Sequence, residues 1–131
     1  MLVRLLSPVL LVLLAACQPG AAPSVGDGVL EIRAVAGPVC PVERAPPDPA
    51  CDPRPVEGAR ILVSPGDGRD IVVAEAETGR DGVARIRLRE GDYIVTGLEV
   101  PGLFRSPEPV TVTIAAAVTE VLVLTWDTGI R

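Results

Sequence analysis

The hydrophobic positions of this chain follow a period of two along much of its length. Residues 29–35 place Leu30, Ile32 and Ala34 on one face, and residues 110–114 alternate valine or isoleucine with threonine. A period of two is typical of strands with one buried face. No long segment shows the 3.6-residue period of a helix. The pattern therefore predicts an all-β protein.

Turn signals rich in glycine, proline and aspartate separate the apolar runs. Seven strands are expected, at residues 29–35, 60–63, 71–77, 83–89, 91–96, 110–114 and 118–125. Several short strands separated by turn signals are typical of a sandwich of two sheets. We therefore expect a seven-stranded Greek-key β-sandwich over residues 28–131.

The segment 71–89 carries the clearest hairpin signal, because a glycine-rich turn at residues 79–82 joins two alternating runs. The outward positions of the second run are all arginine: Arg85, Arg87 and Arg89. Glu75 and Glu77 on the first run predict a ladder of cross-strand ion pairs with them. The alternative is that the arginines form an anion-binding stripe for acidic glycans.

The first 16 residues have the features of a secretory leader. Arg4 provides one positive charge, and the apolar run at residues 5–14 is interrupted only by Ser7 and Pro8. This run is too short to cross a bilayer as a helix. Residues 1–16 are therefore predicted to be a signal peptide that directs the chain out of the cytoplasm.

Cys17 ends the sequence Leu14-Ala15-Ala16-Cys17, which resembles the lipobox of bacterial lipoproteins. The resemblance implies diacylation of Cys17, cleavage just before it and attachment to a bacterial cell membrane. The absence of aspartate at position 18 favours the outer membrane if the organism has one. Residues 17–27 then form a flexible tether. The alternative is an ordinary signal-peptide cleavage that leaves Cys17 as a thiol or a disulfide partner.

Lipidation of Cys17 would leave an even pair, Cys40 and Cys51, in a compartment where disulfides persist. We expect the two to be bonded and to close a proline-rich loop. The ten residues between them do not match the spacing of a redox CxxC motif, and no second pair completes a zinc site. The loop is therefore predicted to be structural, although it is also a place where binding groups occur.

The composition removes several kinds of chemistry. The chain has no histidine, lysine or asparagine, which excludes Ser/His triads, histidine-ligated zinc and Schiff-base lysines. The net charge of −5 argues against nucleic-acid binding. The aspartates Asp67, Asp70 and Asp81 lack the ligand spacing of an EF-hand. No cofactor and no metal are expected.

The chain has three aromatic residues, Tyr93, Phe104 and Trp126. Tyr93 follows a tight turn and is predicted to anchor a corner by returning its hydroxyl to nearby backbone. Trp126 follows the last strand and is predicted to close one end of the core. The alternative for Trp126 is an exposed platform for a sugar ring.

Three short motifs resemble the carboxypeptidase regulatory-like domain, a prealbumin-like (transthyretin-like) sandwich. They are P-V-x-G-A at residues 55–59, T-x-x-D-G at 78–82 and G-x-Y-x-V at 91–95, with Glu90 where proline is usual. The resemblance covers residues 54–125, and the cysteine loop resembles a subset found in secreted proteins. It implies an accessory or adhesive module, without the zinc site of the peptidase that names the family. The related collagen-binding B-type repeats form a Lys–Asn isopeptide bond, which this chain cannot make.

Together these patterns predict a non-enzymatic, lipid-anchored surface module that serves structure or protein interaction. The alternative is a lipoprotein that binds a glycan or peptide through the 38–58 loop, Trp126 and the arginine face. An enzyme is the third hypothesis, because paired carboxylates hydrolyse glycosides, but no such pair stands out.

Overall fold

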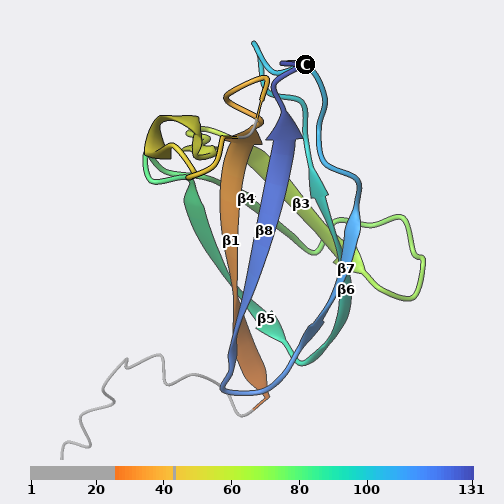
Figure 1. Cartoon of the computed structure of the whole chain (residues 1–131). Helices are drawn as coiled ribbons and strands as arrows, with labels where there is room; N and C mark the ends of the chain where they lie inside the picture. Colours follow the sequence, from red (N-terminus) through yellow and green to blue (C-terminus); the bar gives the residue numbers. More distant parts are fainter. Residues whose placement is uncertain (1–25, 43) are drawn as a thin grey trace, which may run out of the picture.

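The computed structural model describes residues 26–42 and 44–131, and these residues form two β-sheets around one core (Figure 1). One sheet contains β1 (Asp27–Gly37), β2 (Arg54–Pro55), β5 (Val83–Arg89) and β8 (Thr119–Asp127). The other has the order β4 (Ala74–Glu77), β3 (Arg60–Pro65), β6 (Gly91–Gly97) and β7 (Val110–Ile114). The predicted all-β sandwich is confirmed, and the two-residue β2 makes eight strands where seven were expected. The predicted leader and Cys17 lie outside the described residues.

β1 is the central strand of its sheet. β8 runs parallel to it, in a register from Val29 opposite Thr119 to Gly37 opposite Asp127. β5 and β2 pair antiparallel with successive parts of β1, so both lie along its other edge. The first and last strands of the domain are therefore neighbours, as the orange and blue arrows of Figure 1 show. All pairings in the second sheet are antiparallel.

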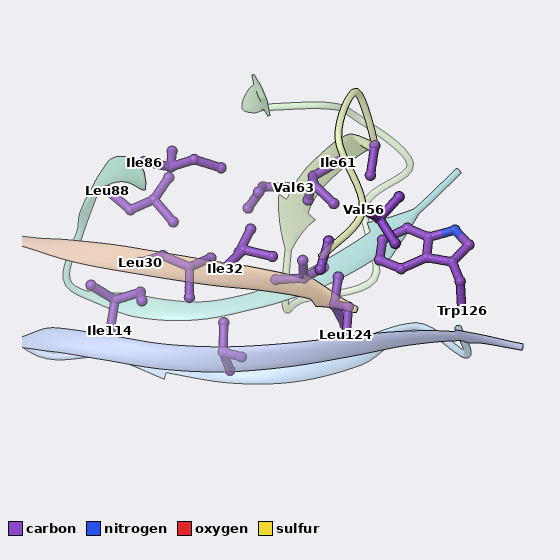
Figure 2. Packing of buried hydrophobic residues seen from close by; sticks show 14 of the residues in the cluster. Leu30, Ile32, Val56, Ile61, Val63, Ile86, Leu88, Ile114, Leu124 and Trp126 are labelled. Carbon is purple, nitrogen blue, oxygen red and sulfur yellow. The ribbon is translucent and has the colours of Figure 1, made fainter. Parts of the chain in front are cut away.

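The core lies between the sheets and is built from the alternating apolar positions of both (Figure 2). In β5, Ala84, Ile86 and Leu88 are buried and the arginines between them are exposed, as the pattern predicts. Trp126 is fully buried, and its indole Nε1 donates a hydrogen bond to the carbonyl of Leu98 at 2.9 Å. Its ring lies at one end of the row of core side chains, which matches the predicted plug.

Close packing around the indole explains a glycine in β6. A Cβ atom added to Gly97 would lie 2.7 Å from the indole carbon Cζ2 of Trp126. Any side chain at this position would push the ring out of the core. The glycine therefore lets the indole ring pack directly against the backbone of β6.

The predicted hairpin over residues 71–89 is wrong. β4 pairs with β3 in one sheet, and β5 pairs with β1 in the other. The turn that joins them is tight, with the N–H of Gly82 bonded to the carbonyl of Gly79 at 2.9 Å, but it crosses between the sheets. Glu75 consequently pairs with Arg60 and not with the arginines of β5. Charges at alternate positions favour an oppositely charged neighbour without indicating which strand supplies it.

The strand expected at residues 71–77 begins only at Ala74. Ile71, Val72 and Val73 belong to the preceding loop and are 46, 53 and 48% exposed. Three β-branched apolar residues in a row favour a strand, but β3 ends at Pro65 and its register with β4 begins only at Ala74. Among the described residues, no helix is long and apolar enough to cross a membrane.

Candidate functional site

The structure divides the three outward arginines of β5 into two environments. Arg85 donates from Nε to Glu31 of β1 at 3.0 Å, and Arg33 donates to the other oxygen of the same carboxylate at 3.0 Å. The Glu31 side chain is only 12% exposed. The hydrogen bond from Arg33 and the one from Arg85 hold the pKa of Glu31 below its ordinary value, against the effect of desolvation. Arg85 is thus held in an ion-pair cluster on the outer face of the sheet.

Arg87 and Arg89 instead line a hollow of about 700 Å³ at the far end of β5. The loop after β3 contributes Asp67 and Arg69 to its wall, and β6 contributes Asp92 and Tyr93. We call these six side chains the arginine hollow. Both Arg87 and Arg89 are exposed, and neither forms an ion pair with any residue in the described ranges.

The acidic groups of the hollow already have partners. Asp67 accepts hydrogen bonds from the backbone N–H of Arg69 at 3.0 Å and from its Nε at 2.7 Å, which lowers the pKa of Asp67. Asp92 accepts a hydrogen bond from the Thr113 hydroxyl at 2.7 Å. Asp27 of β1 is opposite Arg89 in the strand register, but no ion pair holds Arg87 or Arg89 within the described residues. Their exposed guanidinium groups can therefore bind an incoming carboxylate or other anion.

Tyr93 fixes the geometry of the hollow. Its hydroxyl donates to the backbone carbonyl of Arg89 at 2.8 Å, four residues earlier. The phenol thus ties the end of β5 to β6 across the turn at Gly91. This is the corner arrangement predicted from the sequence, and it holds Arg89 beside the hollow.

An apolar rim adjoins the arginine hollow. It consists of Ile71, Val72 and Val73, of which Val73 also lines the hollow. The N–H of Val73 donates to the carbonyl of Val63 at 2.8 Å, which anchors the end of this loop. The sequence pattern predicts a strand for these residues, but β4 begins only at Ala74 and leaves them as an exposed rim.

The opposite end of the sandwich carries Phe104, which is 63% exposed. The guanidinium carbons of Arg105 and Arg131 lie 5.6 and 5.9 Å from the centre of its ring, within the range of cation–π contacts. Trp126 borders a second hollow of about 630 Å³ at this end but offers no exposed face. The alternative prediction for Trp126 was an exposed platform that binds a sugar ring. The ring is fully buried in the core, so it cannot serve as such a platform.

The disulfide between Cys40 and Cys51 is present. The proline-rich loop between these cysteines ends in the short helix η1 (Pro49–Cys51), whose first turn is capped by Asp48 through a 2.9 Å bond from the N–H of Ala50. The described part of the loop brings no group of reactive side chains together.

The described residues contain no group of three or more residues that could hold a metal ion. Their carboxyl groups with a shifted pKa are Glu31, Asp67 and Asp127, and each pKa is lowered, chiefly by hydrogen bonds to arginine side chains or backbone N–H groups. The exposed guanidinium groups of the arginine hollow are suited to binding an anionic group.

Solved structures with a similar fold include bacterial pilins. The chain is similar to the minor pilin GBS52 of Streptococcus agalactiae, with a TM-score of 0.60 and 19% identity over 79% of this chain and 45% of that one. The major pilin SpaD of Corynebacterium diphtheriae has a TM-score of 0.55 and 17% identity over 77% and 32%. A DUF3823 family protein of Parabacteroides merdae has a TM-score of 0.52 and 16% identity over 78% and 46%.

No family model matches the sequence, and no curated protein matches it. The chain spans less than half the length of each solved structure described above. At these identities the likeness establishes a shared sandwich fold.

Proposed function

We propose that this protein is a non-enzymatic, lipid-anchored module that binds another protein outside the cytoplasm. The leader at residues 1–16, lipidation of Cys17 and the tether at 17–27 supply the anchor, and residues 28–131 supply the binding domain. The resemblance to carboxypeptidase regulatory-like domains and the similarity to pilins support an accessory or adhesive role.

The observation that carries the binding role is the apolar rim beside the arginine hollow. Large apolar side chains that stay exposed in a contiguous group mark interaction sites more often than isolated ones do. Arginine and tyrosine are enriched among the residues that dominate protein interfaces. The rim and the hollow bring these two kinds of contact together on one end of the sandwich.

Charge indicates the partner's chemistry. The chain as a whole carries a net charge of −5, yet the hollow is lined by three arginines and two aspartates. One of these arginines, Arg69, is paired with Asp67, which leaves Arg87 and Arg89 to attract negative charge. The partner segment that fits is acidic, with at least one apolar side chain placed to cover the rim.

A photo-activated cross-linker at position 72 tests this proposal in intact cells that express the full-length chain. Val72 is half exposed on the rim, and Val42 in the disulfide loop is 68% exposed and serves as the matched control position. We expect one cross-linked partner protein from position 72 that is absent from position 42. Its cross-linked peptide should carry aspartate or glutamate.

The double variant R87E/R89E provides the second arm. Both side chains are exposed, so the reversal of charge leaves the core intact and repels an acidic segment. We expect at least a fivefold loss of the cross-link from position 72. Cross-linking of the same proteins from both positions, or a yield unaffected by R87E/R89E, would contradict the proposed site.

A further inference from the structure

The last strand has an open edge. Along one side β8 pairs with β1, and the carbonyl of Val118 accepts a bond from the N–H of Val29 at 2.9 Å. At Asp127 the N–H points the other way and donates to the carbonyl of Arg105 at 2.9 Å. Because these directions alternate along a strand, the N–H and C=O groups of the odd-numbered residues point away from β1. From Thr119 to Thr125, no residue in the described ranges pairs with this edge.

The edge has little of the usual protection against pairing. Edge strands are commonly interrupted by proline or carry charged side chains, especially lysine. β8 contains neither proline nor lysine, and Glu120 is its only charged residue before Asp127. The outward side chains are exposed and β-branched, in the order Thr119, Val121, Val123 and Thr125. This outward order reads the same in both directions about Leu122.

We infer that β8 pairs antiparallel with β8 of a second copy of this chain, around a two-fold axis at Leu122. In this register Thr119 faces Thr125 of the second copy, and Val121 faces its Val123. At all four outward positions a residue then lies opposite one of the same type. Each is a hydrogen-bonded pair, because the odd-numbered residues of both strands point their backbone N–H and C=O groups at the other copy. The symmetric outward pattern favours a second copy over an unrelated strand.

The antiparallel arrangement brings no like charges together at the new edge. Glu31 is the β1 neighbour of Val121, and Arg33 is the neighbour of Val123. Each row of side chains across the joined sheets therefore has Glu31 of one copy at one end and Arg33 of the other copy at the opposite end. In the antiparallel register Glu120 is opposite Leu124 of the second copy, so no like charges meet across the new edge.

A single pair of strands buries less area than the roughly 1,200 Å² at the lower end of stable interfaces. The dimer is therefore weak in dilute solution, and the dimerised fraction rises when chains are concentrated on one surface. The anchor at Cys17 would provide that concentration, but the pairing geometry does not depend on it.

Disulfide trapping with V121C and V123C tests the pairing. The full-length variants are given different tags, expressed together and separately, and oxidised in intact membranes. The proposed register places Cα atoms of positions 121 and 123 about 5.5 Å apart, within reach of a disulfide, and equal positions beyond about 7 Å. We expect the mixed pair to form at least five times as much cross-linked dimer as either variant alone.

V118C is the matched control, because Val118 is 48% exposed and precedes the strand. The parent chain measures any dimer formed through the native cysteines. Retention of the Cys40–Cys51 bond shows that each variant is folded. Equal dimer from the mixed and single variants, no dimer above the parent level, or cross-links to a different protein would overturn the inference.

Discussion

Thr78 is a buried residue whose hydroxyl holds an irregular segment in place. The hydroxyl donates to the carbonyl of Val56 at 2.6 Å and accepts from the N–H of Ala59 at 2.9 Å. Thr78 belongs to the turn between β4 and β5. Its hydroxyl thereby fixes the segment from Val56 to Ala59, which leads into β3. The threonine of the T-x-x-D-G motif is therefore a structural residue, and the motif marks a crossing between sheets.

Replacing Thr78 with valine tests this role. The change T78V keeps the shape but leaves two buried backbone groups without their side-chain partner, so we expect a loss of about 3 kcal/mol in unfolding free energy. The change T78S keeps the hydroxyl and should cost about 1 kcal/mol for the lost methyl group. Urea denaturation measures both. Equal unfolding free energies of the two variants would show that the hydrogen bonds of the hydroxyl do not stabilise the fold.

Glu31 makes the stability of the outer face depend on pH. Because the pKa of Glu31 is lower in the folded chain, the unfolded chain binds a proton first as the pH falls. The contribution is therefore full at neutral pH and is lost as the pH falls through the acidic range. We expect E31Q to be less stable than the parent at neutral pH.

The difference between E31Q and the parent should shrink as the pH falls below the ordinary glutamate pKa. Thermal denaturation at a series of pH values measures it, with E75Q as a control at an exposed ion pair. A stability difference that stays constant down to strongly acidic pH would contradict the assigned role of Glu31 in the cluster with Arg33 and Arg85.

At the scale of elements, the alternating pattern located most strands to within a few residues, because burial on one face imposes a period of two. The ends of β5 and β7 agree with the sequence prediction. The alternating pattern did not predict which strands pair with each other. Each pairing in the first sheet joins segments far apart along the chain, and local alternation contains no information on such contacts.

The same reason limited the prediction of the site. Arg87 and Arg89 were identified from the outward face of β5, but their separation from Arg85 depends on Glu31, 54 residues away from Arg85 along the chain. The apolar rim was missed because its residues have strand propensity. Propensity describes a residue that fits a sheet and does not guarantee that an adjacent strand is present.

The disulfide loop gives a prediction at this scale. Removing the bond by C40S/C51S frees the unfolded chain, and we expect a loss of about 2 to 3 kcal/mol, since the prolines between the cysteines already restrict that segment. Urea denaturation of the parent and the variant in the same buffer measures the change. A midpoint that does not move would contradict a stabilising role for the loop.

At the scale of the whole molecule, the parallel pairing of β1 and β8 joins both ends of the domain. Trp126 on β8 then reaches across to β6 at Gly97 and Leu98. The domain is therefore complete only when its last strand is in place. The two proposed surfaces are the arginine hollow at one end of the sandwich and the open edge of β8 on the side away from β1.

We propose above all that this sandwich works outside the cytoplasm on a lipid anchor at Cys17. The most direct test is the intact mass of the protein from its own membranes, before and after reduction and alkylation. The account predicts a chain that begins at Cys17 with a diacylglyceryl adduct, and alkylation of Cys40 and Cys51 only after reduction. A chain without lipid, or free thiols at Cys40 and Cys51 before reduction, would contradict it.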